Sequence, residues 1–196
     1  MFMKRIAKSF IALLIILVFY VQHLVAQQLS PEAAKLKTNY VQLKIYPGSK
    51  PKQLAYIKSF PDNKQQFDAV FEPNGSGQLH SEYFEYVNTF AGLAKDYQEA
   101  VINKLVTISK DLSYGPGAAK QLQLILIQLG DQYTRAFAIK LKTLSAHDLD
   151  NLAKLMADRD QIKDFLPYQE LIDALDKINE VALADKFLDA RVKREK

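Results

Sequence analysis

The stretch that decides the fold runs from residue 86 to residue 112 and reads YVNTFAGLAKDYQEAVINKLVTISKDL. Its apolar residues recur at steps of three and four, which is the spacing of one face of an α-helix. The members of this stripe are Tyr86, Phe90, Leu93, Tyr97, Val101, Leu105, Ile108 and Leu112. The pattern predicts one long amphipathic helix over residues 80–112.

A second stripe follows over residues 118–144, AAKQLQLILIQLGDQYTRAFAIKLKTL, with the same kind of spacing. Its members are Ala118, Leu122, Leu126, Leu129, Tyr133, Phe137, Leu141 and Leu144. The connecting sequence SYGPG contains glycine and proline, which end one helix and begin the next. Two helices of matched length joined by a short loop pack most simply side by side, so we expect a long antiparallel αα-hairpin over residues 80–144.

Two further helical segments follow the expected hairpin. Ser145 and Asp148 have the three-residue spacing of a helix N-cap motif and precede an apolar stripe. Pro167 opens the last segment, which Ile178-Asn179-Glu180 could divide in two. The sequence therefore predicts an all-α fold, a helical bundle domain over residues 79–196 built on the long hairpin.

Residues 27–78 differ from the rest of the chain in composition. Five of the seven prolines fall between residues 31 and 73, which excludes one long helix there and predicts short proline-bounded helices that pack on the main body. Ser30 and Pro31 are typical of a helix start. Residues 41–46, VQLKIY, alternate apolar and polar side chains, so they fit a strand as well as a helix and both interpretations stay open.

The first 26 residues have the order of a secretory signal peptide. Three basic residues precede an apolar run from Phe10 to Val21, and Ala26 offers a small residue at the cleavage point. A spanning helix needs roughly 20 apolar residues, and Gln22 and His23 interrupt the run before that length is reached. We expect a signal peptide over residues 1–26 and an exported protein, periplasmic or extracellular. The alternative is a retained membrane anchor formed by residues 10–26.

Composition limits the chemistry. The chain has no cysteine, which excludes thiol catalysis, zinc sites with cysteine ligands and iron–sulfur clusters. The formal net charge is +4, and three of the positive charges, Lys4, Arg5 and Lys8, lie in the expected signal peptide. Without them the net charge is about +1, which gives no argument for a nucleic-acid partner.

The strongest catalytic candidates are His80, Glu82 and Glu85, which lie together after the glycine-containing turn PNGSG. An imidazole and two carboxylates on one helix face could divide acid and base roles if burial separates their pKa values. The same residues also suit a helix start, because Ser81 is a good N-cap and acidic side chains in a first turn complement the helix dipole. These residues are weak candidates, and an enzyme is not the preferred interpretation.

Metal and cofactor motifs are not found in the sequence. Outside the expected signal peptide only His80 and His147 remain, and neither has a partner at the spacing of a zinc or di-iron motif. The acidic run over residues 158–164 has neither the glycine nor the terminal glutamate of a calcium-binding loop. We therefore expect no metal and no cofactor.

By elimination, the sequence predicts an exported non-catalytic binding or protein-interaction module of the cell envelope or extracellular space, with an unidentified protein partner. Two alternatives remain. One is a carrier of an apolar, lipid-like ligand within the helical bundle, since the chain is rich in tyrosine and phenylalanine. The other is a hydrolase that uses His80, Glu82 and Glu85. Membrane contact is expected only if residues 1–26 are retained.

Overall fold

The lysine-rich N-terminal part of the protein folds into three short helices separated by prolines. A computed structural model describes residues 29–71, 78–113, 115, 117–158 and 162–195, so the expected signal peptide lies outside the described residues. The three helices are α2 (Pro31–Ile45), α3 (Lys50–Ser59) and α4 (Lys64–Phe71). Pro31 begins α2 as predicted. Residues 41–45 are helical, because Leu36, Tyr40 and Leu43 share one buried face of α2.

The two long helices of the predicted hairpin are not confirmed, because each stretch divides into two helices. The first stretch forms the 3₁₀ turn η1 (His80–Glu82), α5 (Tyr83–Gly92) and α6 (Ala94–Ser109), and the second forms α7 (Ala118–Gln132) and α8 (Thr134–Leu141). Tyr97 has the non-helical angles φ −135° and ψ 44°, and Tyr133 has φ −123° and ψ 46°. The apolar spacing continues through both breaks, so periodicity alone could not reveal that the chain turns back there.

The C-terminal segments follow the prediction more closely. They form α9 (Ala146–Ala157), the 3₁₀ turn η2 (Ile162–Asp164), α10 (Leu166–Lys177) and α11 (Val181–Arg194). The Ser145 hydroxyl caps α9 by accepting a hydrogen bond of 3.1 Å from the backbone N–H of Asp148. The division between α10 and α11 falls at Ile178-Asn179-Glu180, where Asn179 has a φ of +64° that ends α10.

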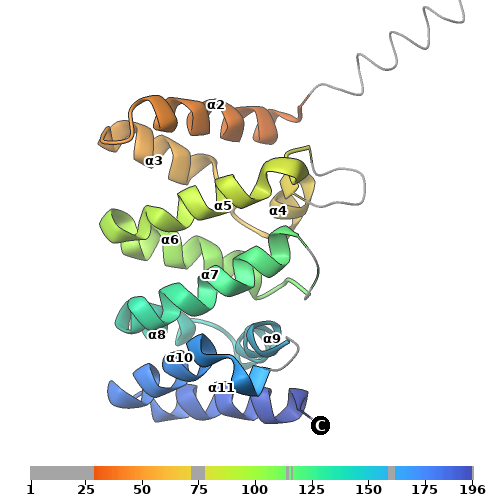
Figure 1. Cartoon of the computed structure of the whole chain (residues 1–196), viewed down its shortest axis with the longest axis vertical. Coiled ribbons are helices and arrows are strands. Elements are labelled where there is room, and N and C mark those ends of the chain that lie inside the picture. Colours follow the sequence, from red (N-terminus) through yellow and green to blue (C-terminus); the bar gives the residue numbers. More distant parts are fainter. Residues whose placement is uncertain (1–28, 72–77, 114, 116, 159–161, 196) are drawn as a thin grey trace, which may run out of the picture. The chain divides into compact units, whose positions relative to one another are not determined.

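Helices stack in pairs within the compact unit formed by residues 32–196. Figure 1 shows α5 running back along α6, α7 along α8, and α10 along α11, with α2 and α3 as a further pair. The α5–α6 pair packs on α7 and α8, which in turn contact α10, while α9 packs against α11 and α7. The turns within the pairs lie along one edge of Figure 1, and α6 and α11 end at the opposite edge.

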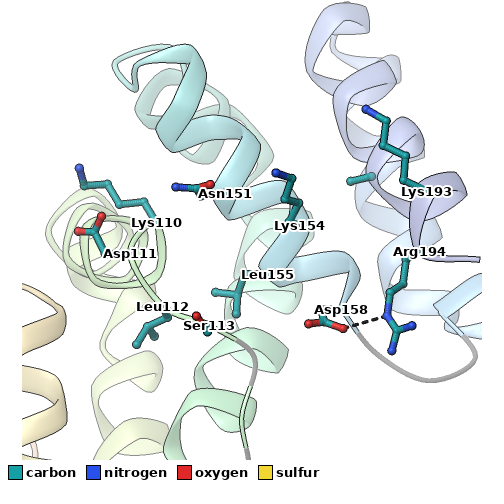
Figure 2. A pocket seen from close by; sticks show the side chains of 11 residues that line it. Lys110, Asp111, Leu112, Ser113, Asn151, Lys154, Leu155, Asp158, Lys193 and Arg194 are labelled. Atoms are coloured by element: carbon teal, nitrogen blue, oxygen red, sulfur yellow. Dashed lines mark hydrogen bonds and ion pairs between the residues drawn. The ribbon is translucent and has the colours of Figure 1, made fainter.

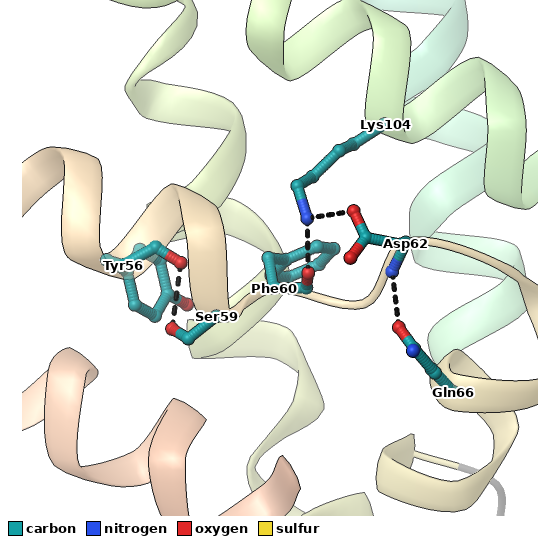
Figure 3. Close-up of polar contacts among 6 residues, drawn as sticks. All are labelled: Tyr56, Ser59, Phe60, Asp62, Gln66 and Lys104. Atoms are coloured by element: carbon teal, nitrogen blue, oxygen red, sulfur yellow. Dashed lines mark hydrogen bonds and ion pairs between the residues drawn. The ribbon is translucent and has the colours of Figure 1, made fainter.

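Aromatic side chains fill the core where α2 and α3 meet α5. Tyr56, Tyr86, Phe60 and Phe90 are each at most 1% exposed, and the rings of Phe60 and Phe90 stack with their centroids 3.8 Å apart. The Lys104 ammonium of α6 donates to the backbone carbonyl of Phe60 at 2.6 Å (Figure 3). These contacts fix the α3–α4 connection on the α5–α6 pair.

The described residues contain no helix with the length and hydropathy needed to cross a bilayer.

Candidate functional site

An open cavity of about 590 Å³ lies where α6, α9 and α11 end. We call it the basic cavity, because four of its lining side chains are cationic: Lys110, Lys154, Lys193 and Arg194. Figure 2 shows that these side chains come from three elements, the end of α6, α9 and α11. Leu112, Leu155 and Ala190 form its apolar part, and Asp111 and Asp158 supply the acidic side chains.

The position of the basic side chains follows from the helix ends. Lys110 directly follows α6, Lys154 lies in the last turn of α9, and Lys193 and Arg194 lie in the last turn of α11. The C-terminal end of a helix carries partial negative charge on its unpaired carbonyl groups, which favours lysine and arginine there. Three such ends converge at the cavity, so the fold concentrates positive side chains at one place.

Two of the four cations form ion pairs at the rim. The Lys110 ammonium donates to Asp148 at 2.9 Å, and this hydrogen bond lowers the pKa of the Asp148 carboxyl and raises the pKa of Lys110. The Arg194 guanidinium donates through Nε to Asp158 at 2.9 Å (Figure 2). These pairs tie α11 and the end of α6 to the segment that carries α9.

Lys154 and Lys193 are the two exposed lysines of the cavity. Neither donates a hydrogen bond to the nearby Asp150, and both act on it only through their charge. The Asp150 carboxylate accepts a hydrogen bond of 2.5 Å from Lys186, which is the main cause of its lowered pKa. The charges of Lys154 and Lys193 lower that pKa further without a hydrogen bond. Both side chains therefore keep donors directed to solvent, on neighbouring helices α9 and α11.

A buried glutamine holds the end of α9 in place. Gln123 of α7 is 1% exposed, and its Nε2 donates to the carbonyl of Leu155 at 2.7 Å and to that of Asp158 at 3.2 Å. The Leu155 carbonyl otherwise accepts only a longer bond of 3.3 Å from the backbone N–H of Asp158, because the helix ends there. Gln123 thus fixes the backbone that presents Asp158 to the basic cavity.

The sequence-predicted catalytic residues lie away from the basic cavity, and each has its own partner. The Nδ1 of His80 donates to the backbone carbonyl of Phe71 at 2.9 Å, and the imidazole stacks against Tyr83. Because a carbonyl oxygen can only accept, Nδ1 carries the proton. This hydrogen bond orients the imidazole relative to Phe71, the last residue of α4. Gly117 leaves room for this ring, because a Cβ there would lie 3.2 Å from His80 Cε1.

The two carboxylates are directed toward α2. Glu85 accepts a hydrogen bond of 2.5 Å from the Tyr40 hydroxyl, and Glu82 Oε1 lies 3.9 Å from the Lys37 ammonium. Neither carboxylate lines the basic cavity. His80, Glu82 and Glu85 thus stabilise local structure, and this arrangement adds no support for a hydrolase, which stays a prediction.

The basic cavity has few groups for chemistry other than binding. Its described lining has one hydroxyl, that of Ser113, and neither histidine nor cysteine. Among all described residues, no cluster of three or more histidine, aspartate or glutamate side chains could hold a metal ion. The arrangement is suited to holding an anionic group between two ammonium groups and a guanidinium.

Comparison of the chain with protein-family models, with curated proteins and with solved structures finds no match in any of the three.

Sequence reasoning missed the basic cavity because its residues are far apart in the chain. A signal was present, since basic side chains lie at the C-terminal ends of α6, α9 and α11, which the fold then brings together. It also missed a short internal repeat, in which Leu93-Ala94 precede Tyr97 as Leu129-Gly130 precede Tyr133. Such a repeat is typical of stacked helix pairs, and it coincides with the two unpredicted helix breaks.

Proposed function

We propose that this protein is a non-catalytic binding module and that its basic cavity binds an acidic segment of a partner protein. One observation carries the proposal: Lys154 and Lys193 lie on adjacent helices, both exposed, at the edge of a cavity with an apolar part. Two ammonium groups on adjacent helices favour carboxylates over neutral ligands. The module works by geometry and charge and needs no reacting group.

A peptide segment fits this cavity better than a compact small ligand. The cavity is open, and Leu112 and Leu155 lie beside the cations, so a bound segment would place acidic side chains at the lysines and an apolar side chain between them. Stacked helix pairs commonly present such surfaces to extended partners.

The carrier of an apolar ligand is less well supported. Many of the aromatic side chains of the described residues are fully buried against one another, as in the Phe60–Phe90 stack, and serve as core. The basic cavity and a second cavity of about 410 Å³ beside Arg135 and Glu180 are both lined mainly by polar and charged side chains. Neither lining is suited to a lipid chain.

Site-specific photo-crosslinking in the native host tests the proposal. A photoreactive amino acid at Asn151, inside the basic cavity, should capture segments enriched in aspartate and glutamate. The double variant Lys154→Glu/Lys193→Glu should lower the yield at least tenfold, since two favourable charges become repulsive. The matched control Lys95→Glu/Lys120→Glu makes the same change in net charge on exposed residues away from the cavity.

The control variant should keep the wild-type yield. Captured segments without an excess of acidic residues, or equal losses in both double variants, would contradict the proposal.

We also propose, from residues 1–26 alone, that the protein is exported and acts in the cell envelope or outside the cell. N-terminal sequencing of the protein from its native host tests this, and a start at Met1 would contradict cleavage after Ala26.

A further inference from the structure

The turn between α2 and α3 exposes three large apolar side chains. Val41 is 44% exposed, Ile45 57% and Tyr46 55%. Val41 and Ile45 are four residues apart in α2 and therefore share one face, and Tyr46 directly follows them. We call these three residues, with Lys44 and Lys50, the α2–α3 tip. In Figure 1 the turn lies at the edge opposite to the ends of α6 and α11.

The charge of the segment that carries the tip has a single sign. Residues 33–61 contain six lysines and no aspartate or glutamate. Two carboxylates that face α2 are engaged there: Glu82 of η1 with Lys37, and Glu85 of α5 with the Tyr40 hydroxyl. The tip itself keeps Lys44 and Lys50 exposed on either side of Ile45 and Tyr46.

Hydrogen bonds hold the turn in one conformation. The side chain of Gln53, 8% exposed, donates to the Pro47 carbonyl at 2.8 Å, and its Oε1 accepts a bond of 3.0 Å from the Tyr97 hydroxyl. The backbone N–H of Ser49 donates to the Tyr46 carbonyl, which closes the turn. The exposure of Ile45 and Tyr46 is therefore a fixed feature of the fold.

We propose that the α2–α3 tip docks on the surface of an anionic phospholipid bilayer. Ile45 and Tyr46 enter the interfacial layer, where an aromatic ring with a hydroxyl is favoured, and Lys44 and Lys50 meet the phosphates. Each lysine near an anionic leaflet strengthens binding about fivefold. A second copy of the chain is disfavoured as the occupant, because two such surfaces would oppose lysine to lysine.

The chain contains no tryptophan, so a single introduced indole reports on its own surroundings. In the full chain, Tyr46→Trp places the probe at the tip. Vesicles of phosphatidylcholine and phosphatidylglycerol should shift its emission to shorter wavelength, and vesicles of phosphatidylcholine alone should not. The control Phe84→Trp, at a site 58% exposed on α5, should show no shift with either. A local probe separates docking of the tip from any binding by other parts of the chain.

Charge removal gives the second readout. In the Tyr46→Trp background, Lys44→Gln/Lys50→Gln should raise the vesicle concentration for half-maximal shift about 25-fold, and Lys95→Gln/Lys120→Gln should leave it nearly unchanged. No shift in the Tyr46→Trp variant, or an equal shift in the Phe84→Trp variant, overturns the proposal. A shift that depends on protein concentration without vesicles would also overturn it and assign the tip to self-association. The proposal is independent of the basic cavity.

Discussion

The Tyr40 hydroxyl donates a hydrogen bond of 2.5 Å to the Oε2 of Glu85, although the two residues are 45 positions apart in the chain. The Tyr40 ring also packs on Tyr86, with centroids 4.4 Å apart, so α2 is fixed to α5 by one polar and one aromatic contact. This bond joins the lysine-rich N-terminal helices to the rest of residues 32–196. A single side chain thus links elements that are distant in the sequence.

Replacement of Tyr40 by phenylalanine should lower the free energy of unfolding by about 1 kcal/mol. The variant keeps the ring stacked on Tyr86 and removes the hydrogen bond to Glu85, which is exposed and can turn to water instead. Urea denaturation followed by circular dichroism measures the change. Tyr46→Phe is the control, because that hydroxyl is on a ring 55% exposed and should matter little. Equal stability of Tyr40→Phe and wild type would contradict the prediction.

The same bond predicts a dependence of stability on alkaline pH. The pKa of Tyr40 is raised from 10.0 to about 12. The largest cause is burial, followed by the hydrogen bond to Glu85 and then the negative charge of Glu85. The folded protein thus holds this proton more tightly than the unfolded chain, so the contribution is complete below pH 10 and is lost as pH rises from 10 toward 12. Tyr56, Tyr86 and Tyr168, whose pKa values burial also raises, act in the same direction. Between about pH 9 and 11, wild type should lose more stability than Tyr40→Phe in urea titrations.

Replacement of Lys104 by methionine should cost about 1–2 kcal/mol. The ammonium donates to the Phe60 carbonyl at 2.6 Å and to Asp62 at 2.5 Å, and both bonds are lost while the aliphatic stem is kept (Figure 3). Because the Asp62 side chain is 65% exposed, Asp62→Asn should cost less than about 1 kcal/mol. Lys95→Met on the same helix should be neutral. If Asp62→Asn costs as much as Lys104→Met, the carbonyl bond is not the main contribution.

Replacement of Gly130 by alanine should destabilise the protein by about 1–3 kcal/mol through overpacking. A Cβ at this position would lie 3.0 Å from Leu171 Cδ1 and 3.0 Å from Phe137 Cε1, in the contact between α7, α8 and α10. Gly92→Ala is the matched control, since nothing lies within 4 Å of its added Cβ. Alanine in a helix should there be neutral or stabilising by up to about 1 kcal/mol. The same direction of change in both variants would argue against close packing at Gly130.

Replacement of Gln123 by leucine should cost about 1–2 kcal/mol, because the carbonyls of Leu155 and Asp158 lose the hydrogen bonds from the Gln123 amide. The loss is partly offset, since the buried Oε1 of Gln123 has no partner of its own among the described residues. Gln128→Leu, exposed on the same helix, should stay within about 0.5 kcal/mol of wild type. Thermal unfolding followed by circular dichroism measures both. A stabilised Gln123→Leu would mean that the orphaned oxygen costs more than the carbonyl bonds contribute.

Helix content was predictable because it depends on local pattern. The stripe through Phe90 and Val101 needs only spacing, and helix starts such as Ser145 and Pro167 act on their own neighbours. The direction of the chain at Tyr97 and Tyr133 was not predictable in the same way. Both residues stay on the apolar stripe after the backbone has turned, so the reversal is decided by packing, as where Phe137 closes on Gly130.

The candidate sites were even harder to predict from the sequence than the chain reversals. His80, Glu82 and Glu85 form a cluster in the sequence, but their partners Phe71, Lys37 and Tyr40 are supplied by other elements. The basic cavity combines Lys110, Lys154 and Lys193 from three segments that together span more than 80 residues, so it exists only after the pairs have stacked.

The stacking of Phe60 on Phe90 has a consequence for the order in which the chain can fold during synthesis. The α2–α3 pair leaves the ribosome with Tyr40, Tyr56 and Phe60 uncovered, because their partners on α5 have yet to be made. For the time needed to add about 30 further residues, this aromatic surface is open to holding factors or to other nascent chains. Until α5 has been made, the N-terminal pair thus exposes aromatic surface that the finished protein buries.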